Sequence, residues 1–335
     1  MISERAGVLP PDDPLHPLLT SALGVGYGDA IEAYKLGREG AVYVYVHVPS
    51  GARVIGKFYG RKWMRMDSAS AEDLRGLLMR REFENLELLR RRGFGTGPHL
   101  VPRPLAMSED VDWVLIEEFV NGTNVHHAIR EAILSGSGLL EQNVDAAAAA
   151  LARLHRFAAP VDLLPRKDVS AYFSKVVAQL GQGGVLGDDE RDRLTEIGRG
   201  WDAGGLLQQF ESVMIHGDST PEHFLYDRDS QRMYLIDVES LRHGDPAEDL
   251  GYLAGEIKHL FWTYTRDIWS SESTIRHLYA AYAGAAELPD HETERLTARA
   301  RYFMGCAELR IARNAWLPFS HRRDLVAEAE RCLMI

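Results

Sequence analysis

The stretch from residue 213 to residue 239 limits the possible folds of this chain more than any other part of it. Two short apolar runs lie within it, Phe224–Tyr226 and Met233–Ile236, and a polar segment typical of a turn separates them. This pattern predicts a β-hairpin. A hairpin brings its two open ends together, so the residues just before the first run and just after the second are expected to be neighbours.

Polar side chains that suit one type of reaction lie at these two ends. Asp218 precedes the first predicted strand, Asp237 follows the second, and His223 borders the first. In phosphoryl transfer, one carboxylate orients or deprotonates the attacking hydroxyl, while other groups hold the Mg²⁺ that bridges the nucleotide phosphates. The stretch therefore predicts that Asp218, His223 and Asp237 face one pocket with this chemistry.

The composition indicates a globular protein of one large or two modest domains. The chain has 335 residues, of which 45% are hydrophobic, and its formal net charge is −11. A negative charge disfavours non-specific binding to nucleic acids and anionic membranes. The N-terminus lacks an apolar signal region, and no apolar run approaches the roughly 20 residues of a membrane span. We therefore expect a cytoplasmic protein without nucleic-acid or membrane partners. The two cysteines, Cys306 and Cys332, form no metal-binding or redox pattern.

The first third of the chain is predicted to be rich in strands. Residues 1–25 contain four prolines and are interpreted as irregular, apart from a short helix at 18–23. Runs of β-branched and aromatic residues predict strands at 30–36, 41–48 and 52–59. Lys57 lies within the third of these strands. A buried ammonium needs anionic partners, so Lys57 has either such partners or a solvated place on an edge strand.

Most of the remaining chain is predicted to be helical. Apolar periodicity predicts helices at 74–92, 125–134, 141–157, 168–180, 188–197, 247–260, 273–285, 292–314 and 323–333. The sequence His-Gly-Asp occurs twice, at 216–218 and at 243–245. Asp245 is followed by Pro246, and this pair is typical of a helix N-cap and first helical position. We therefore assign the functional role to the first copy.

The first copy, together with Ile236-Asp-Val-Glu239 later in the sequence, resembles the catalytic segment of the aminoglycoside phosphotransferase family of small-molecule kinases. The resemblance implies that Asp218 is the catalytic base or orienting carboxylate and that His223 and Asp237 bind Mg²⁺. The family pattern has Asn where this chain has His223. Some branches of the family also carry His there, and a neutral imidazole can bind a divalent metal, although Mg²⁺ prefers oxygen.

Further motifs follow in the order expected for this family, over roughly residues 30 to 265. The resemblance implies that Lys57 contacts the nucleotide phosphates and pairs with Glu82. It also implies that Glu118, Phe119 and Val120 form the hinge that binds the nucleotide base. The turn at 37–40 would lie over the phosphates, although a plain hairpin turn explains it as well.

The implied fold is α+β and protein-kinase-like, with a small β-rich lobe that carries one long helix and a large, mostly helical lobe. The expected division is a lead-in at 1–28, a nucleotide-binding lobe at 29–120 and a catalytic lobe at 121–335. The expected reaction moves the γ-phosphate of ATP or GTP to a hydroxyl group of an aminoglycoside or other antibiotic. A metabolic kinase of a sugar or amino alcohol and a weakly catalytic pseudokinase are the alternatives. The expected state is a monomer or a homodimer.

Overall fold

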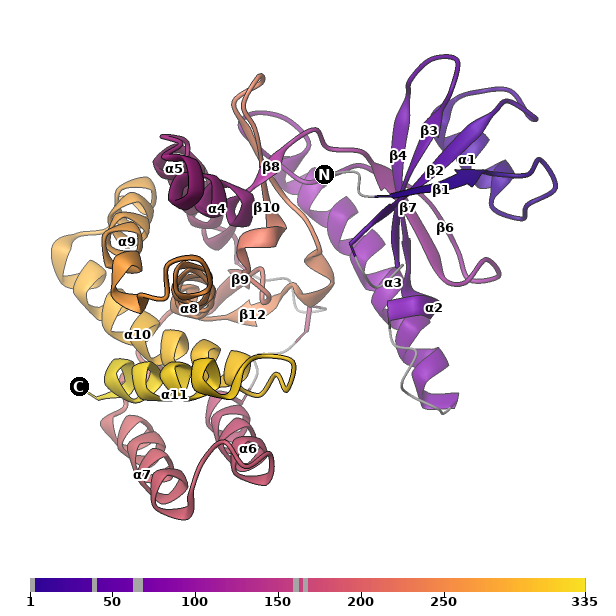
Figure 1. Cartoon of the computed structure of the whole chain (residues 1–335). Coiled ribbons are helices and arrows are strands. Elements are labelled where there is room, and N and C mark those ends of the chain that lie inside the picture. The colour runs from indigo at the N-terminus through magenta and orange to yellow at the C-terminus, as the bar shows by residue number, and fades with distance from the viewer. Residues whose placement is uncertain (1–3, 38–40, 63–68, 159–162, 165–167, 335) are drawn as a thin grey trace. The chain divides into compact units, whose positions relative to one another are not determined.

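A computed structural model describes residues 4–37, 41–62, 69–158, 163–164 and 168–334. The chain forms two compact units (Figure 1). The first consists of Met1–Gly122 and Tyr234–Glu239, and the second of Thr123–Met233 and Ser240–Ile335. Most of the predicted turn at 37–40 lies outside the described residues. A short segment of the second half of the chain thus belongs to the first unit.

The first unit is built on an antiparallel sheet with the order β1-β2-β3-β4-β7-β6. Its strands are β1 (Glu4–Val8), β2 (Ile31–Leu36), β3 (Val42–His47), β4 (Arg53–Phe58), β6 (Pro104–Ser108) and β7 (Val114–Glu118), and β5 (His99–Leu100) lies outside this sheet. Its helices are α1 (His16–Leu23), α2 (Tyr59–Lys62), α3 (Ala69–Leu89) and the π-helical turn Arg90–Phe94. The three strands predicted at 30–59, the short helix and the long helix are confirmed.

The interpretation of residues 1–25 as irregular apart from one helix is wrong at its start. Glu4–Val8 forms β1, which pairs with β2 in antiparallel register, with a bulge between Arg5 and Gly7. Its residues are mostly exposed, so the strand has no apolar alternation that sequence analysis could detect. Backbone hydrogen bonds to β2 hold it in place, and those depend on a partner distant in the sequence.

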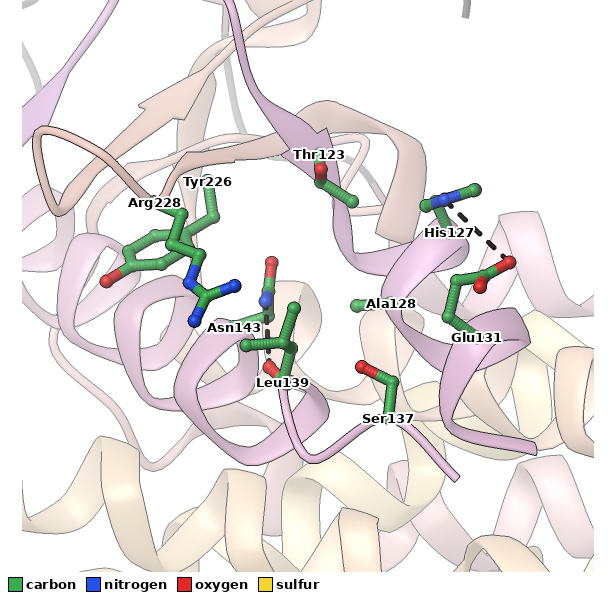
Figure 2. Close-up of a pocket in the computed structure, with 9 residues that line it drawn as sticks. All are labelled: Thr123, His127, Ala128, Glu131, Ser137, Leu139, Asn143, Tyr226 and Arg228. Atoms are coloured by element: carbon green, nitrogen blue, oxygen red, sulfur yellow. Dashed lines mark hydrogen bonds and ion pairs between the residues drawn. The ribbon is translucent and has the colours of Figure 1, made fainter. Parts of the chain in front are cut away.

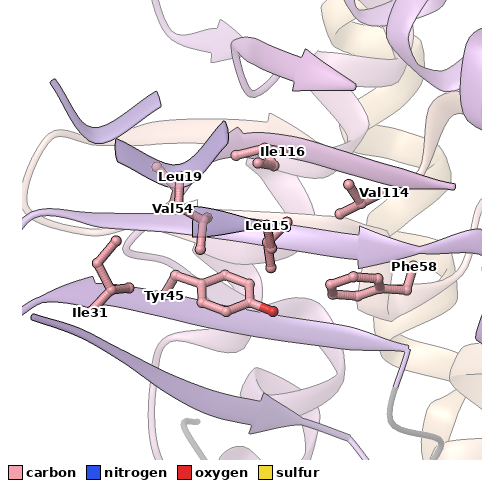
Figure 3. Packing of buried hydrophobic residues seen from close by; sticks show 8 residues of the cluster. All are labelled: Leu15, Leu19, Ile31, Tyr45, Val54, Phe58, Val114 and Ile116. Carbon is pink, nitrogen blue, oxygen red and sulfur yellow. The ribbon is translucent and has the colours of Figure 1, made fainter. Parts of the chain in front are cut away.

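One face of the sheet is covered by α1 (Figure 3). The cluster there consists of Leu15, Leu19, Ile31, Tyr45, Val54, Phe58, Val114 and Ile116. Each such apolar side chain contributes about 1.5–3 kcal/mol when fully buried. Side chains alternate between the two faces of a strand. Because Val54 and Phe58 of β4 face the cluster, Lys57 must point to the opposite face.

The second unit is mostly helical. Its helices are α4 (Val125–Ser135), α5 (Leu140–His155), α6 (Val169–Gln182), α7 (Asp188–Gly204), α8 (Pro246–Thr265), α9 (Glu272–Ala286), α10 (Asp290–Ala312) and α11 (Phe319–Leu333). Its short strands are β8 (Thr123–Asn124), β9 (Val213–Ile215), β10 (Phe224–Asp227) and β12 (Arg242–Gly244), while β11 (Arg232–Leu235) leads from this unit into the first. β10 pairs with β8, and β12 with β9. Within the described residues, no helix is long and apolar enough to cross a membrane.

The packing of α8 fixes the geometry of the unit around the first His-Gly-Asp segment. Gly251 and Gly255 lie one turn apart where α8 meets α10, and a Cβ at Gly251 would lie only 2.4 Å from the Phe303 Cβ. Only glycine permits so close an approach. The predicted cap of α8 is confirmed, because the Asp245 side chain accepts a hydrogen bond from the Ala247 N–H.

Candidate active site

In the first unit, Lys57 lies at the centre of a cluster of carboxylates. Its side chain is 9% exposed, and the Nζ donates to Glu82 Oε1 of α3 (2.9 Å) and to Asp237 Oδ1 (2.6 Å). Glu117 of β7 forms a third ion pair with the same Nζ at 3.1 Å. The register of β4 and β7 explains this contact, because Ile55 is paired with Glu117. The alternation of the strands puts Lys57 and Glu117 on the same face.

The cluster stabilises the charged form of the lysine. Burial alone would lower the pKa of Lys57, but Asp237, Glu117 and Glu82 together raise it well above its usual value. Burial has the opposite effect on the acids, and it raises the pKa of Glu82 and of Glu117. One ammonium therefore faces more negative charge than it can neutralise. Such a site favours a further cation.

The segment 237–239 is held against α3. The Asn85 Nδ2 donates to the Val238 carbonyl (2.8 Å), and the Glu239 N–H donates to Glu82 Oε2 (3.0 Å). Asp237 has a φ of 56°, in the left-handed region that a non-glycine residue rarely occupies. Carboxylate oxygens of Glu82, Asp237 and Glu239 lie within 4.8 Å of one another. Hard oxygen ligands of this kind fit Mg²⁺.

In the second unit, Asp249 of α8 holds the backbone of the first His-Gly-Asp segment. Its carboxylate accepts hydrogen bonds from the His216 N–H (2.7 Å), the Gly217 N–H (2.9 Å) and the His155 Nε2 (3.0 Å). Burial alone would raise the pKa of Asp249, but the hydrogen bond and charge of His155, the charge of His216 and the Gly217 N–H lower it to about 2. The other ring nitrogen of His155, Nδ1, hydrogen-bonds the Tyr282 hydroxyl at 2.8 Å, so His155 links Asp249 to α9.

Asp218 follows this anchored backbone, and its carboxylate is partly exposed. Arg310 of α10 donates from Nη1 to Asp218 Oδ1 (3.2 Å) and from Nη2 to Glu256 Oε1 (2.7 Å). The guanidinium carbon lies 5.0 Å from the centre of the Tyr252 ring. The His223 Nδ1 hydrogen-bonds the Asp218 carbonyl at 2.7 Å. Since the carbonyl can only accept, Nδ1 carries a proton, and in the neutral ring Nε2 has the lone pair.

More carboxylates lie near Asp218 in the second unit. Burial raises the pKa of Glu256, Arg310 offsets part of this, and the charges of Glu222 and Asp218 raise it further. Glu222 behaves differently: burial alone would raise its pKa, but the hydrogen bond and charge of His126, a backbone hydrogen bond and the charge of His223 together lower it. This side of the unit therefore combines three acidic groups with one guanidinium.

The structure distributes the predicted site residues over both units. Lys57, Glu82 and Asp237 are in mutual contact in the first unit, whereas Asp218 and His223 are neighbours in the second. The joint ligation of one ion by His223 and Asp237 therefore stays a prediction.

Of the three predicted hinge residues, one is already engaged by its neighbouring strand. The Glu118 N–H donates to the Arg103 carbonyl at 2.9 Å. The contacts of Glu118, Phe119 and Val120 with the nucleotide base stay a prediction. The Phe119 ring lies under the Arg53 guanidinium at 4.1 Å.

Sequence analysis missed Glu117 and Arg310. Glu117 could have been found, because it adjoins the predicted hinge and shares a strand face with Leu115. Arg310 is 92 positions from Asp218, and no local pattern connects the two.

A cavity of about 200 Å³ lies in the second unit, between α4, α5, β8 and β10 (Figure 2). Its lining consists of Thr123, His127, Ala128, Glu131, Ser137, Leu139, Asn143, Tyr226 and Arg228. Within this lining, the Asn143 Nδ2 donates to the Leu139 carbonyl (2.8 Å). None of the predicted site residues is part of this lining, and sequence analysis did not anticipate the cavity.

Solved structures with the same fold define the class of protein as kinase-like. Aminoglycoside 2'-phosphotransferase-IIIa, in its GDP complex, is 16% identical, with a TM-score of 0.57 and coverage of 96% of this chain and 97% of that chain. APH(2'')-IIa, in a ternary complex with streptomycin and ATP, is 13% identical, with a TM-score of 0.56 and 96% coverage of both chains. An ethanolamine kinase of Plasmodium vivax is 12% identical, with a TM-score of 0.56 and coverage of 87% of this chain and 77% of that chain.

The family follows from the sequence itself. The model of the phosphotransferase enzyme family, APH, matches residues 63–303, and the chain belongs to this family. It is a small-molecule kinase that uses a hydroxyl acceptor and a nucleotide donor. A comparison with curated proteins found no match. The resemblance, the kinase-like fold and the enzyme class predicted from the sequence are thereby confirmed.

Proposed function

We propose that this enzyme transfers the γ-phosphoryl group of ATP or GTP to a hydroxyl group of a small cationic molecule, in a Mg²⁺-dependent reaction. The observation that carries this proposal is the buried Lys57, which Glu82 and Asp237 hold by short ion pairs. A lysine fixed in this way presents a permanent charge to the nucleotide phosphates. Glu82 orients it, and the hinge formed by Glu118, Phe119 and Val120 binds the base.

Asp218 is the proposed catalytic residue. It orients the acceptor hydroxyl and takes its proton as the oxygen attacks the γ-phosphorus, and the bond from phosphorus to the β–γ bridging oxygen breaks. The Asp249 hydrogen bonds at His216 and Gly217 fix the backbone that carries Asp218. Phosphoryl transfer leaves little covalent work to the protein, so this positioning provides much of the rate acceleration.

Asp237 is the proposed principal metal ligand, with Glu239 beside it and His223 as a further ligand. Mg²⁺ supplies charge neutralisation of the phosphates when it is bound. The carboxylate oxygens around Asp237 support this assignment, because Mg²⁺ prefers oxygen. The imidazole of His223 is the less usual ligand, and its Nε2 has the lone pair that ligation requires.

The acceptor is proposed to be an aminoglycoside, another antibiotic or a metabolic amino alcohol. Asp218, Glu222 and Glu256 place three carboxylates in the second unit, against the single charge of Arg310. An acidic surface of this kind attracts an ammonium group. Two of the similar structures are named for related chemistry, an ethanolamine kinase and a phosphotransferase bound to streptomycin.

The test is an acceptor screen with Mg²⁺ and either ATP or GTP. Aminoglycosides, amino alcohols and neutral sugars are incubated with the enzyme, and mass spectrometry detects the addition of a phosphoryl group. Asp218→Ala should abolish turnover and retain nucleotide binding, whereas Asp229→Ala, an exposed control on the hairpin turn, should retain both.

Two outcomes would change the proposal. Wild-type protein that binds nucleotide but phosphorylates no acceptor would instead support a pseudokinase. Transfer to neutral sugars alone would refute the cationic acceptor. Expression in a sensitive host then separates an antibiotic kinase from a metabolic one, because only the former raises the inhibitory concentration of its substrate.

A further inference from the structure

A second cluster of ionisable groups, none of which has a role in the proposed reaction, lies where α8, α10 and α11 meet. Its centre is Glu308 of α10, which is 0% exposed. Neither of its carboxylate oxygens has a hydrogen-bond partner among the described residues. A buried carboxylate without a partner is costly, and native proteins rarely retain one unless an ion, a proton or a water satisfies it.

Two further ligand atoms lie beside Glu308. Glu328 and Cys332, one turn apart on α11, offer an oxygen and a sulfur, and all three ligand atoms lie within 4.8 Å of one another. The Cys332 Sγ is 3.6 Å from Glu328 Oε1. In a tetrahedral zinc site with bonds of about 2.3 Å to sulfur and about 2.1 Å to oxygen, this edge measures about 3.6 Å. The two α11 ligands therefore have the spacing that such an ion requires.

The net charge of the cluster suits one bound dication. Lys258 of α8 pairs with Glu328 (2.7 Å) and with Glu272, and Arg331 pairs with the same two carboxylates. Together with Glu308, three carboxylates face two cations, which leaves a charge of −1. A dication bound to a thiolate adds +1 and brings the total to zero. A single proton on Glu308 would also balance the charges, and this is the competing explanation.

We propose that Glu308, Glu328 and Cys332 bind one thiophilic divalent cation of the zinc class, which ties α10 to α11. A thiolate among the ligands favours such a metal over Mg²⁺. Binding releases the thiol proton of Cys332, and a proton from Glu308 where it carries one. Lys258 and Arg331 both pair with Glu328 Oε1, so they orient this ligand and share that oxygen with the ion. The site is structural and takes no part in the phosphoryl transfer.

The first test uses the full chain, purified without chelators. Elemental analysis should find about one zinc-class ion per chain. After the metal is removed, titration with Co²⁺ should produce a thiolate-to-cobalt charge-transfer band in the near ultraviolet. Cys332→Ser should abolish the band. Cys306→Ser is the matched control, because Cys306 is also buried in α10 but lies outside the cluster, and it should retain the band.

The second test separates the ion from the proton, because Glu308→Gln has opposite effects in the two cases. If an ion binds, this variant loses the metal, melts at a lower temperature than the wild type and no longer responds to a chelator. If Glu308 carries a proton, the neutral glutamine replaces a neutral acid. Wild-type protein that yields no cobalt band, with Glu308→Gln melting at the same or a higher temperature, would overturn the proposal.

Discussion

Replacing Asp249 with Asn should make the stability of the protein less sensitive to acid. The pKa of Asp249 falls from 3.8 to about 2 on folding. At about 1.36 kcal/mol per pKa unit, this difference corresponds to about 2.4 kcal/mol of stability. A carboxylate with a lowered pKa contributes this stability above pH 3.8 and loses it as the pH falls toward 2. The contribution should drop to about 1.3 kcal/mol at pH 3.

The assay is urea unfolding, followed by tryptophan fluorescence at several pH values between 3 and 7. Asp249→Asn keeps the shape of the side chain and should be less stable than the wild type at pH 7 by about 2–3 kcal/mol. The gap should narrow by about 1 kcal/mol at pH 3. Asp290→Asn, an exposed control at the start of α10, should follow the wild type throughout. A gap for Asp249→Asn that stays constant across this range would refute the electrostatic reasoning.

Three other substitutions have outcomes that the contacts define. Lys57→Met should lower kcat/KM by about 10²–10³-fold, measured by nucleotide-dependent turnover, since it removes a fixed charge from the proposed phosphate site. Gly217→Ala should destabilise the protein by about 2 kcal/mol in urea unfolding, because Gly217 has a φ of 81° and no space for a Cβ. Its control is Gly200→Ala, which has open space in α7 and should stabilise the protein by up to about 1 kcal/mol. Arg310→Met should destabilise it by about 3 kcal/mol, as it leaves Glu256 buried and unpaired, and adding Glu256→Gln should restore most of this loss in the same assay.

Local patterns in the sequence were enough to predict much of the fold. Strands with β-branched residues and the cap at Asp245 depend on neighbouring residues alone, so they could be found by inspection. Lys57 was recognised because a charge inside an apolar strand needs partners, and its contacts with Glu82 and Asp237 are present. The role of these contacts in binding a nucleotide remains a proposal.

The features that sequence analysis missed depend on contacts between distant residues. β1 is mostly exposed, and only its pairing with β2 defines it as a strand. Arg310 and Glu308 lie on the same helix, and their periodicity indicates a helix but not their partners. Cys332 formed no recognisable metal-binding pattern in the sequence, because Glu308 and Lys258 of its cluster lie 24 and 74 positions away and only Glu328 is close by on the same helix.

The assignment of Tyr234–Glu239 to the first unit has a consequence for the synthesis of this protein. Lys57 and Glu82 leave the ribosome long before Asp237, so the ion-pair cluster of the first unit lacks one of its carboxylates while the next hundred or so residues are made. A fragment that ends at Gly122 lacks it permanently. The first unit thus completes its cluster of carboxylates around Lys57 only after about half of the second unit has been translated.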